Sequence, residues 1–166
     1  MEKTIFGCCG HDNIRKFDIE KLAFAIHADY RQKNPGTAND IPWDELTEDI
    51  KESNRDQARD IGTKLKLAGC ACDSGETPFP SIEQFDDETF LYLSKKEHQR
   101  WMDDKKKNGW TYAPVRDNVN KYHPMLVAWD ELPEAEKQKD MDTVANIIPL
   151  LKGIGLRVYK TILWNG

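Results

Sequence analysis

Apolar residues recur at helical spacing in the first half of the chain. Leu22, Ile26 and Tyr30 stand at i, i+4 and i+8, the spacing of one helix face. We expect this helix to begin with the cap residue Asp18 and to end at Pro35-Gly36, because proline and glycine interrupt helices.

A second helix is predicted before Gly69, a residue that suits the left-handed stop of a helix. Ser53 can cap its start, with Asp56 three residues later as a weaker acidic partner. The apolar residues of this helix fall on one face: Ala58, Ile61, Leu65 and Ala68.

The second half shows the same periodicity. Phe90, Leu93 and Trp101 share a helix face, and Asn108-Gly109 is a good helix end. Ser81 with Gln84 has the pattern of a capping box, which predicts a short turn or the start of this helix.

The last predicted helix carries an apolar face and a proline. Val144, Ile147 and Leu151 recur at helical spacing, and we expect Pro149 to kink the helix or to mark its last turns. Residues 156–163 then alternate with period two, which favours a short extended C-terminal segment.

The two halves repeat each other. Trp-Asp-Glu-Leu occurs at 43–46 and again at 129–132. With a different offset, Leu22, His27 and Tyr30 match leucine, histidine and tryptophan of the second half, namely Leu93, His98 and Trp101. Each half therefore reads as a helix, a connector, Trp-Asp-Glu-Leu, a second helix and a glycine stop.

This repeat predicts the fold class. One helical hairpin cannot bury its apolar face alone, whereas two hairpins packed together can. We expect a mainly α protein of two pseudo-twofold-related hairpin repeats with long connectors, joined by a linker at Thr77-Pro78-Phe79-Pro80, since proline resists helix.

Composition narrows the class of function. The 166 residues carry 29 acidic and 24 basic side chains, a net charge of −5, which argues against duplex nucleic acid as a partner. The sequence has no run of 18 apolar residues, so no membrane span is predicted. The N-terminus does not resemble a signal peptide. We therefore expect a cytoplasmic protein.

The four cysteines have two interpretations. Cys8, Cys9, Cys70 and Cys72, with His11, could bind zinc, yet their spacing differs from paired C-x-x-C knuckles. The alternative, which we favour, is small and partly buried thiols, so we expect no metal and no cofactor.

A long string in the second half identifies a family. It runs Glu97-His98-Gln99-Arg100-Trp101, then Trp110-Thr111-Tyr112-Ala113-Pro114-Val115-Arg116-Asp117, then Lys121-Tyr122-His123-Pro124-Met125-Leu126, and closes with Trp129-Asp130-Glu131-Leu132 and Glu136-Lys137-Gln138-Lys139-Asp140. This string resembles the repeat domain of ryanodine receptors, the RyR domain, in its prokaryotic form. The first half resembles the shorter partner repeat, and Ala113 stands where the family usually has glycine.

The resemblance implies a mostly helical domain of two repeats over residues 18–158. The first repeat would span about 18–72, the linker 73–85 and the second repeat 86–158, with an N-terminal arm at 1–17 and a tail at 159–166. The family is associated with nucleotide-type ligands, so the resemblance implies a ligand-sensing module. Calcium conduction is not implied, because no pore helices are predicted.

The loop after Asn108-Gly109 is the candidate ligand site. Aromatic rings can stack on a base, an arginine can bind phosphate through two donors, and a carboxylate can accept from an amine or hydroxyl. Lys105, Lys106 and Lys107 could extend a basic rim, or they could form an ordinary solvated helix face. The predicted ligand-binding residues are Trp101, Trp110, Tyr112, Arg116, Asp117, Lys121 and His98.

A structural interpretation stands beside this one. The loop aromatics could pack the loop onto the helices, and Arg116 could pair with Asp117. His27 and His98 occupy matching positions, which favours a shared structural hydrogen bond over a ligand contact or proton switch. Trp43 and Trp129 are predicted as core anchors, although they could flank a cleft.

Two alternatives to a ligand sensor remain open. The chain could be a protein-interaction module whose aromatics are structural. It could also be a nucleotide-processing enzyme that uses His98 or His123, although the sequence shows no orienting partner for either histidine. We expect no enzymatic activity.

Overall fold

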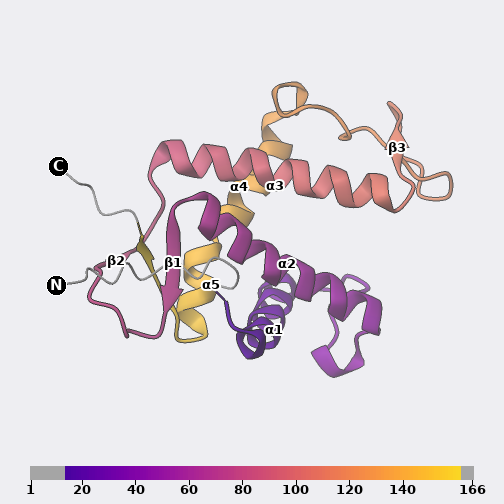
Figure 1. Ribbon diagram of the computed structural model, residues 1–166. Helices are drawn as coiled ribbons and strands as arrows, with labels where there is room; N and C mark the ends of the chain where they lie inside the picture. Colours follow the sequence, from indigo (N-terminus) through magenta and orange to yellow (C-terminus); the bar gives the residue numbers. More distant parts are fainter. Residues whose placement is uncertain (1–13, 162–166) are drawn as a thin grey trace. The chain divides into compact units, whose positions relative to one another are not determined.

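The computed structural model describes residues 14–161 (Figure 1). It is 56% helical with a small sheet, which confirms a mainly α protein. The chain divides into two compact units: unit 1 is Met1–Glu83 with Ile148–Gly166, and unit 2 is Gln84–Ile147. The packing of the two helix pairs about a pseudo-twofold axis stays a prediction.

Two helices form the main body of unit 1. Helix α1 (Lys16–Lys33) packs on α2 (Glu48–Leu67), and the 3-10 turn η1 (Trp43–Glu45) lies in the connector between them. The predicted apolar faces meet in the core, where Leu22, Ala58, Ile61 and Leu65 are all buried.

The start predicted for α2 is wrong by six residues. The helix begins at Glu48 after Thr47, and Ser53 lies inside it. Glu48 and Asp49 occupy the first turn, where carboxylates interact favourably with the helix dipole. A hydrogen bond from the Thr47 side chain lowers the pKa of Asp49. The predicted stop is confirmed, because Gly69 has a φ of 64°.

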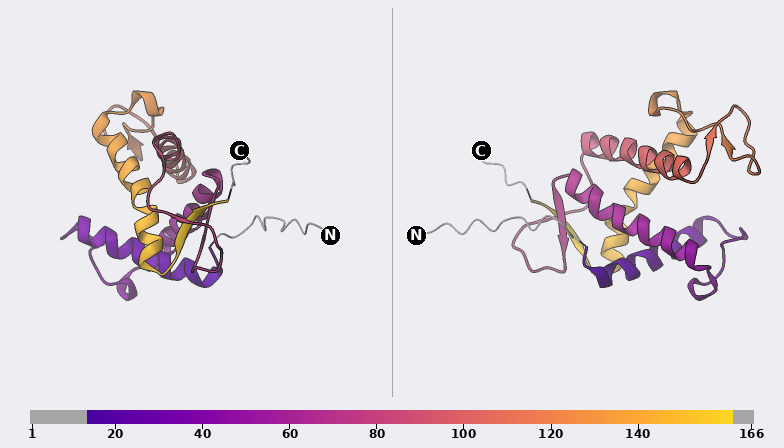
Figure 2. Two further views of the ribbon diagram at one scale, coloured as in Figure 1. Left: turned by 90° about the vertical axis from the view of Figure 1, so that its left-hand side faces the viewer. Right: turned by 45° about the vertical axis from the view of Figure 1, so that its right-hand side comes forward.

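Unit 1 also contains a three-stranded antiparallel sheet. Strand β5 (Arg157–Lys160) lies between β1 (Cys70–Asp73) and β2 (Ser81–Ile82), with Ala71 and Ser81 both opposite Tyr159 (Figures 1 and 2). The expected extended segment near the C-terminus is therefore a strand, and it has two partners that the sequence did not predict.

Arg157 fastens the segment that precedes α3 to this sheet. Its guanidinium donates to Asp73 Oδ1 at 2.9 Å and to the main-chain oxygen of Thr77 at 2.6 Å, and it also contacts the oxygen of Phe79. One side chain of β5 thus satisfies several acceptors in the proline-containing segment.

Unit 2 is built on a second helix pair. Helix α3 (Asp87–Lys107) packs on α4 (Glu134–Ala145). Their connector contains a short parallel pair, β3 (Thr111–Tyr112) and β4 (Tyr122–His123), and the 3-10 turn η2 (Trp129–Glu131).

The capping box predicted at Ser81 is wrong, because Ser81 belongs to β2. The cap of α3 is Asp86, whose side chain accepts from the Thr89 amide at 2.9 Å. The predicted end of α3 is confirmed by Gly109, which has a φ of 84°.

The structure has two helices where the sequence predicts a single helix kinked at Pro149. Helix α4 ends at Ala145, and α5 (Ile147–Gly153) begins two residues later. Pro149 has no N–H to donate to the Ala145 carbonyl, and its ring would clash with that carbonyl in a continuous helix.

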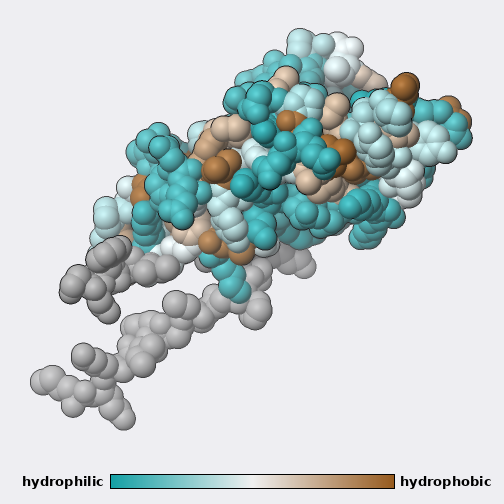
Figure 3. Space-filling model, turned by 90° about the horizontal axis from the view of Figure 1, so that it is seen from above, coloured by the Kyte–Doolittle hydropathy of each residue, from teal (hydrophilic) through white to brown (hydrophobic). Residues whose placement is uncertain are grey.

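The surface and the helices are predominantly polar. The face shown in Figure 3 is mainly hydrophilic, with isolated hydrophobic residues, as the mean hydropathy of −0.74 leads us to expect. Among residues 14–161, no helix combines the length and apolar character that a membrane-spanning segment requires.

Candidate functional site

A cavity of about 510 Å³ lies within unit 2, between α3, the β3–β4 connector and α4. We call it the unit 2 cavity. Its wall combines aromatic, cationic and acidic side chains. They include Glu97, His98, Trp101, Lys105, Arg116, His123, Lys139 and Asp140.

His98 and Asp140 form one end of the cavity. The buried His98 ring places Nε2 2.7 Å from the oxygen of Val127, and Nδ1 3.3 Å from Asp140 Oδ2. Because a carbonyl only accepts, Nε2 carries a proton. Burial raises the pKa of Asp140 to about 6, against the opposing effect of the nearby His98.

Glu97 adds a second acid at this end. Its side chain is buried and receives two hydrogen bonds from Arg100, from Nε at 3.0 Å and Nη2 at 2.7 Å. The forked geometry compensates the cost of burying this side chain.

Aromatic rings form the middle of the wall. Trp101 stacks on His98, with centroids 5.8 Å apart and planes at 21°. His123 meets Trp101 edge-on at 4.9 Å and Trp110 at 6.0 Å. Trp101 therefore lines the cavity, whereas Trp110 contacts His123 without being part of the lining.

Three cations converge on His123 at the other end. Burial lowers the pKa of His123, and the charges of Arg116, Lys105 and Lys139 lower it further. The Lys105 ammonium also lies 4.7 Å from the Trp110 ring centroid. His123 Nδ1 accepts from the Met125 amide at 3.1 Å, so its other nitrogen carries the proton of the neutral ring.

Three of the seven predicted site residues line the cavity: His98, Trp101 and Arg116. Trp110 supports it through His123 and Lys105. The other three, Tyr112, Asp117 and Lys121, are not among its lining residues.

Asp117 and Lys121 instead shape the connector. The Asp117 carboxylate accepts from the amides of Val119 and Asn120, at 2.9 and 3.0 Å, and these bonds lower its pKa. Lys121 adopts a φ of 58° and donates from Nζ to the Asn108 oxygen at the end of α3, at 2.8 Å. Both residues therefore fix the loop that presents Arg116.

The family match coincides with this part of the chain. Residues 81–160 match the family model of the RyR domain. The chain contains a RyR domain. The matched residues include all of unit 2, and they also include β2 and β5 of unit 1.

The charged cavity residues of the RyR domain that sequence reasoning missed include Glu97, Lys139 and Asp140. All three belong to the string that carries the resemblance. Their helical spacing gave a signal, because Glu136, Lys139, Asp140 and Thr143 share one face of α4. The side of α4 that faces α3 could not be read from so polar a helix.

The predicted structural bond of the two histidines is confirmed. In unit 1, His27 Nε2 lies 2.8 Å from the oxygen of Ile41, and the ring packs near Tyr30 and Trp43. The acceptor is the histidine's own connector in each unit. Trp43 and Trp129 pack on these histidines but stay partly exposed, so they line the connectors rather than the core.

The two helix pairs differ where the cavity is acidic. The position that matches Glu97, 71 residues earlier, is the buried Ile26, and the position that matches Asp140, 86 residues earlier, is Asn54. The RyR domain therefore places carboxylates in unit 2 where unit 1 has an apolar and a neutral side chain.

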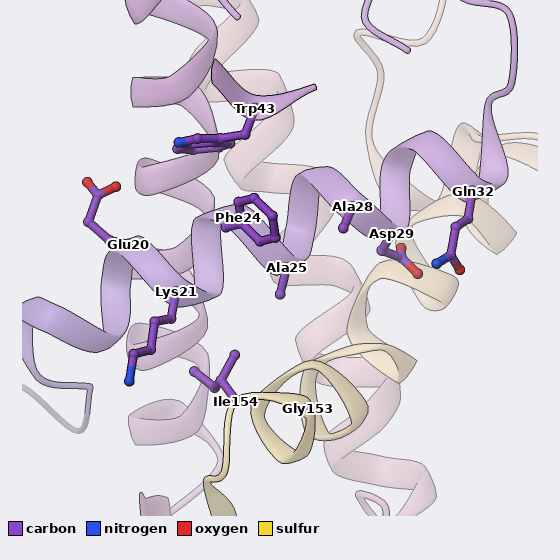
Figure 4. Close-up of a pocket in the computed structure, with 10 residues that line it drawn as sticks. All are labelled: Glu20, Lys21, Phe24, Ala25, Ala28, Asp29, Gln32, Trp43, Gly153 and Ile154. Atoms are coloured by element: carbon purple, nitrogen blue, oxygen red, sulfur yellow. The ribbon is translucent and has the colours of Figure 1, made fainter. Parts of the chain in front are cut away.

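Unit 1 has a different hollow, the unit 1 groove, with a volume of about 770 Å³ (Figure 4). Phe24, Ala25 and Ala28 of α1 line it with Trp43 and Ile154. The Phe24 ring meets Trp43 edge-on at 6.1 Å and is 54% exposed. The groove is apolar, with charged residues such as Glu20 and Lys21 at its margin.

Part of the alternative zinc site lies outside the described residues, namely Cys8, Cys9 and His11. Cys70 is buried and Cys72 half-buried in β1, and burial raises the pKa of the Cys72 thiol to about 12. Among residues 14–161, no three His, Cys, Asp or Glu side chains are placed together to hold a metal ion.

Proposed function

We propose that the RyR domain is a non-enzymatic, cytoplasmic ligand-sensing module whose unit 2 cavity binds a nucleotide-like small molecule. One observation carries the proposal. Trp101 lines a cavity that has Lys105, Arg116 and Lys139 at one end and, at the other, the buried His98 paired with the half-buried Asp140.

The cation end suits a phosphate group. Arg116 can present two donors to phosphate oxygens, and lysine ammonium groups add positive charge. Trp101 can stack on a base, an interaction worth about 1–3 kcal/mol in single-strand binders. Stacking and charge together match the two parts of a nucleotide.

The buried Glu97 and the half-buried Asp140 support a function beyond folding. Carboxylates are costly to bury unless they are paired and hydrogen-bonded. Unit 1 forms the same histidine-to-carbonyl bond with Ile26 and Asn54 at the matching positions. The helix pair therefore does not need Glu97 or Asp140 in order to form this contact.

The bonding of the histidines favours binding over catalysis. Both ring nitrogens of His98 are engaged, by Val127 and Asp140, and His123 Nδ1 is held by Met125. A general base needs a nitrogen within reach of the substrate proton. Turnover of any nucleotide that is lost in a folded His98→Ala variant would contradict this part of the proposal.

Sensing would follow from the elements that the ligand bridges. The cavity is lined by α3, the β3–β4 connector and α4. A ligand that contacts all three would stabilise the arrangement of the connector on the helices, and a partner could detect that change.

A thermal-shift screen with mono-, di-, cyclic and dinucleotides tests the proposal. A ligand at about 100 times its dissociation constant should stabilise the protein by about 2.7 kcal/mol. Arg116→Ala and Lys105→Ala should weaken binding at least tenfold, whereas Lys106→Ala, on the same helix but outside the cavity, should not. No shift across the panel, or unchanged affinity in the first two variants, would refute the proposal.

The unit 1 groove favours a second candidate function, namely protein binding. Its exposed Phe24 and its apolar lining would suit an apolar segment of another protein. A stoichiometric partner that is lost on Phe24→Ser and retained on Arg116→Ala would support this function.

A further inference from the structure

The unit 2 cavity has two ends of opposite charge. At the cation end, Arg116, Lys105 and Lys139 act on His123, and Glu136, which accepts from Lys139 Nζ at 2.8 Å, opposes them. At the acid end, His98, Glu97 and Arg100 act on Asp140. A ligand that is anionic at one end and donates hydrogen bonds at the other would complement both ends, since three cations outnumber Glu136 at the cation end.

Helix α3 sets the distance between these ends. His98, Trp101 and Lys105 stand at i, i+3 and i+7, on one face of the helix. At 1.5 Å of rise per residue, about 10 Å of helix separates His98 from Lys105. Trp101 lies between them on α3, and Asp140 of α4 lies beside His98. The order through the cavity is therefore acceptor, aromatic side chain and cation, which is also the order of amine, base and phosphate in a nucleotide.

Asp140 has an oxygen atom at the acid end that can accept a further hydrogen bond. Its Oδ2 faces His98, and among the described residues Oδ1 makes no hydrogen bond. Oδ1 is not sealed off, since no side-chain oxygen of the described residues is both buried and unbonded. Glu97 is different, because Arg100 holds both of its oxygens.

The His98 contact does not require Asp140. Unit 1 makes the matching bond from His27 to Ile41 with Asn54 in the place of the acid, and the Asn54 side chain turns back to the Ile50 oxygen at 2.9 Å. The carboxylate of Asp140 is therefore a feature of the cavity rather than of the repeated histidine contact.

We infer that Asp140 makes the unit 2 cavity selective for nucleotides whose base carries an exocyclic amine, which donates to Oδ1 while the phosphate lies among Lys105, Arg116 and Lys139. This inference rests on the proposed function, since it assigns the ligand's orientation and chemical class at the same site.

Two pairs of nucleotides differ only by such an amine. AMP has one that purine riboside 5′-monophosphate lacks, and GMP has one that IMP lacks. Calorimetric titration at about pH 7.5, above the pKa of about 6 of Asp140, should show that the amine improves affinity at least tenfold in one pair, as a hydrogen bond to a charged group does.

Asp140→Ala should remove this preference and bind both members of the pair alike. The matched control is Asp142→Ala, on the same helix but outside the cavity, which should keep the preference. Equal affinities within both pairs in the wild type, or a preference retained in Asp140→Ala, would overturn the inference while Arg116-dependent binding leaves the proposed function intact. If none of the four nucleotides binds, the proposed function fails together with the inference.

Discussion

His98 and Val127 are 29 residues apart in sequence, yet the histidine Nε2 lies 2.7 Å from the valine oxygen. His27 holds Ile41 in the same way at 2.8 Å. Each bond ties a helix to the connector that follows it, just before a Trp-Asp-Glu turn. The repeated sequence thus encodes a repeated local contact.

Replacing either histidine should destabilise the protein. His98→Ala and His27→Ala each remove a donor from a partly buried carbonyl, which should lower the free energy of unfolding by about 1–3 kcal/mol. Urea titration of the two variants beside Gln99→Ala, an exposed neighbour on α3, provides the comparison. A loss no larger than that of the control would show that these bonds do not hold the connectors.

The stability of the wild type should carry a pH dependence that Asp140→Asn removes. The pKa of Asp140 is raised by burial to about 6, from about 3.9 in unfolded chains. A raised pKa contributes stability that is present below about pH 4 and lost as the pH rises through 6.

The melting temperature of the wild type should therefore fall relative to that of Asp140→Asn between about pH 4 and pH 7. We expect a change on the order of 1–2 kcal/mol in their stability difference. The opposite trend would mean that the charged His98 outweighs burial and lowers the pKa of Asp140.

Substitutions of Lys121 can distinguish the cost of its backbone strain from the contribution of its helix-capping hydrogen bond. Its φ of 58° is costly for a residue with a Cβ atom, whereas its Nζ caps α3 at Asn108. Lys121→Ala loses the bond and keeps the strain, but Lys121→Gly loses both. We expect the glycine variant to be about 1 kcal/mol more stable than the alanine variant by thermal denaturation. Equal stabilities would argue against the strain.

The contribution of Asp117 to the stability of the connector should depend on pH. Hydrogen bonds from Asn120 and Val119 lower its pKa, so the stability they contribute is present above the ordinary pKa of about 3.9 and is lost as the pH falls through the folded value. Amide exchange at Val119 and Asn120 should gain protection from this carboxylate at neutral pH, and Asp117→Ala should lose that protection. Unchanged exchange would indicate that the turn forms without it.

Arg157 should not be replaceable by lysine. Its fork reaches Asp73, Thr77 and Phe79 together, a geometry that a single ammonium cannot reproduce. Arg157→Lys should cost about 1.5–3 kcal/mol by urea titration, whereas Lys160→Arg at the exposed end of the same strand should be neutral. A neutral Arg157→Lys would show that charge alone suffices.

The sequence predicted helices well where apolar side chains repeat. Leu22 and Leu93 match across the repeat and both are fully buried. It failed where local signals compete, as at Ser53 and Ser81, whose capping patterns give way to an earlier helix start and to a strand. Strands β1 and β2 are too short to show a period, and their pairing with β5 depends on residues more than 70 positions away.

The candidate site was predictable only in part. Trp101 and Arg116 were identified by residue type, and both line the cavity. Asp117 was chosen for the same reason, yet its carboxylate is used by its own loop. Asp140 was missed because the face of a polar helix that turns inward is set by tertiary packing, which spacing alone does not reveal.

The position of β5 in the middle of its sheet has a consequence for biosynthesis. Residues 157–160 must leave the ribosome before β1 and β2 can be joined, because within residues 14–161 these two strands pair only with β5. In the sequence, unit 2 stands between the two segments of unit 1, and its last residue is Ile147. Its helix pair can therefore form during translation, before the central strand of the unit 1 sheet has been synthesised.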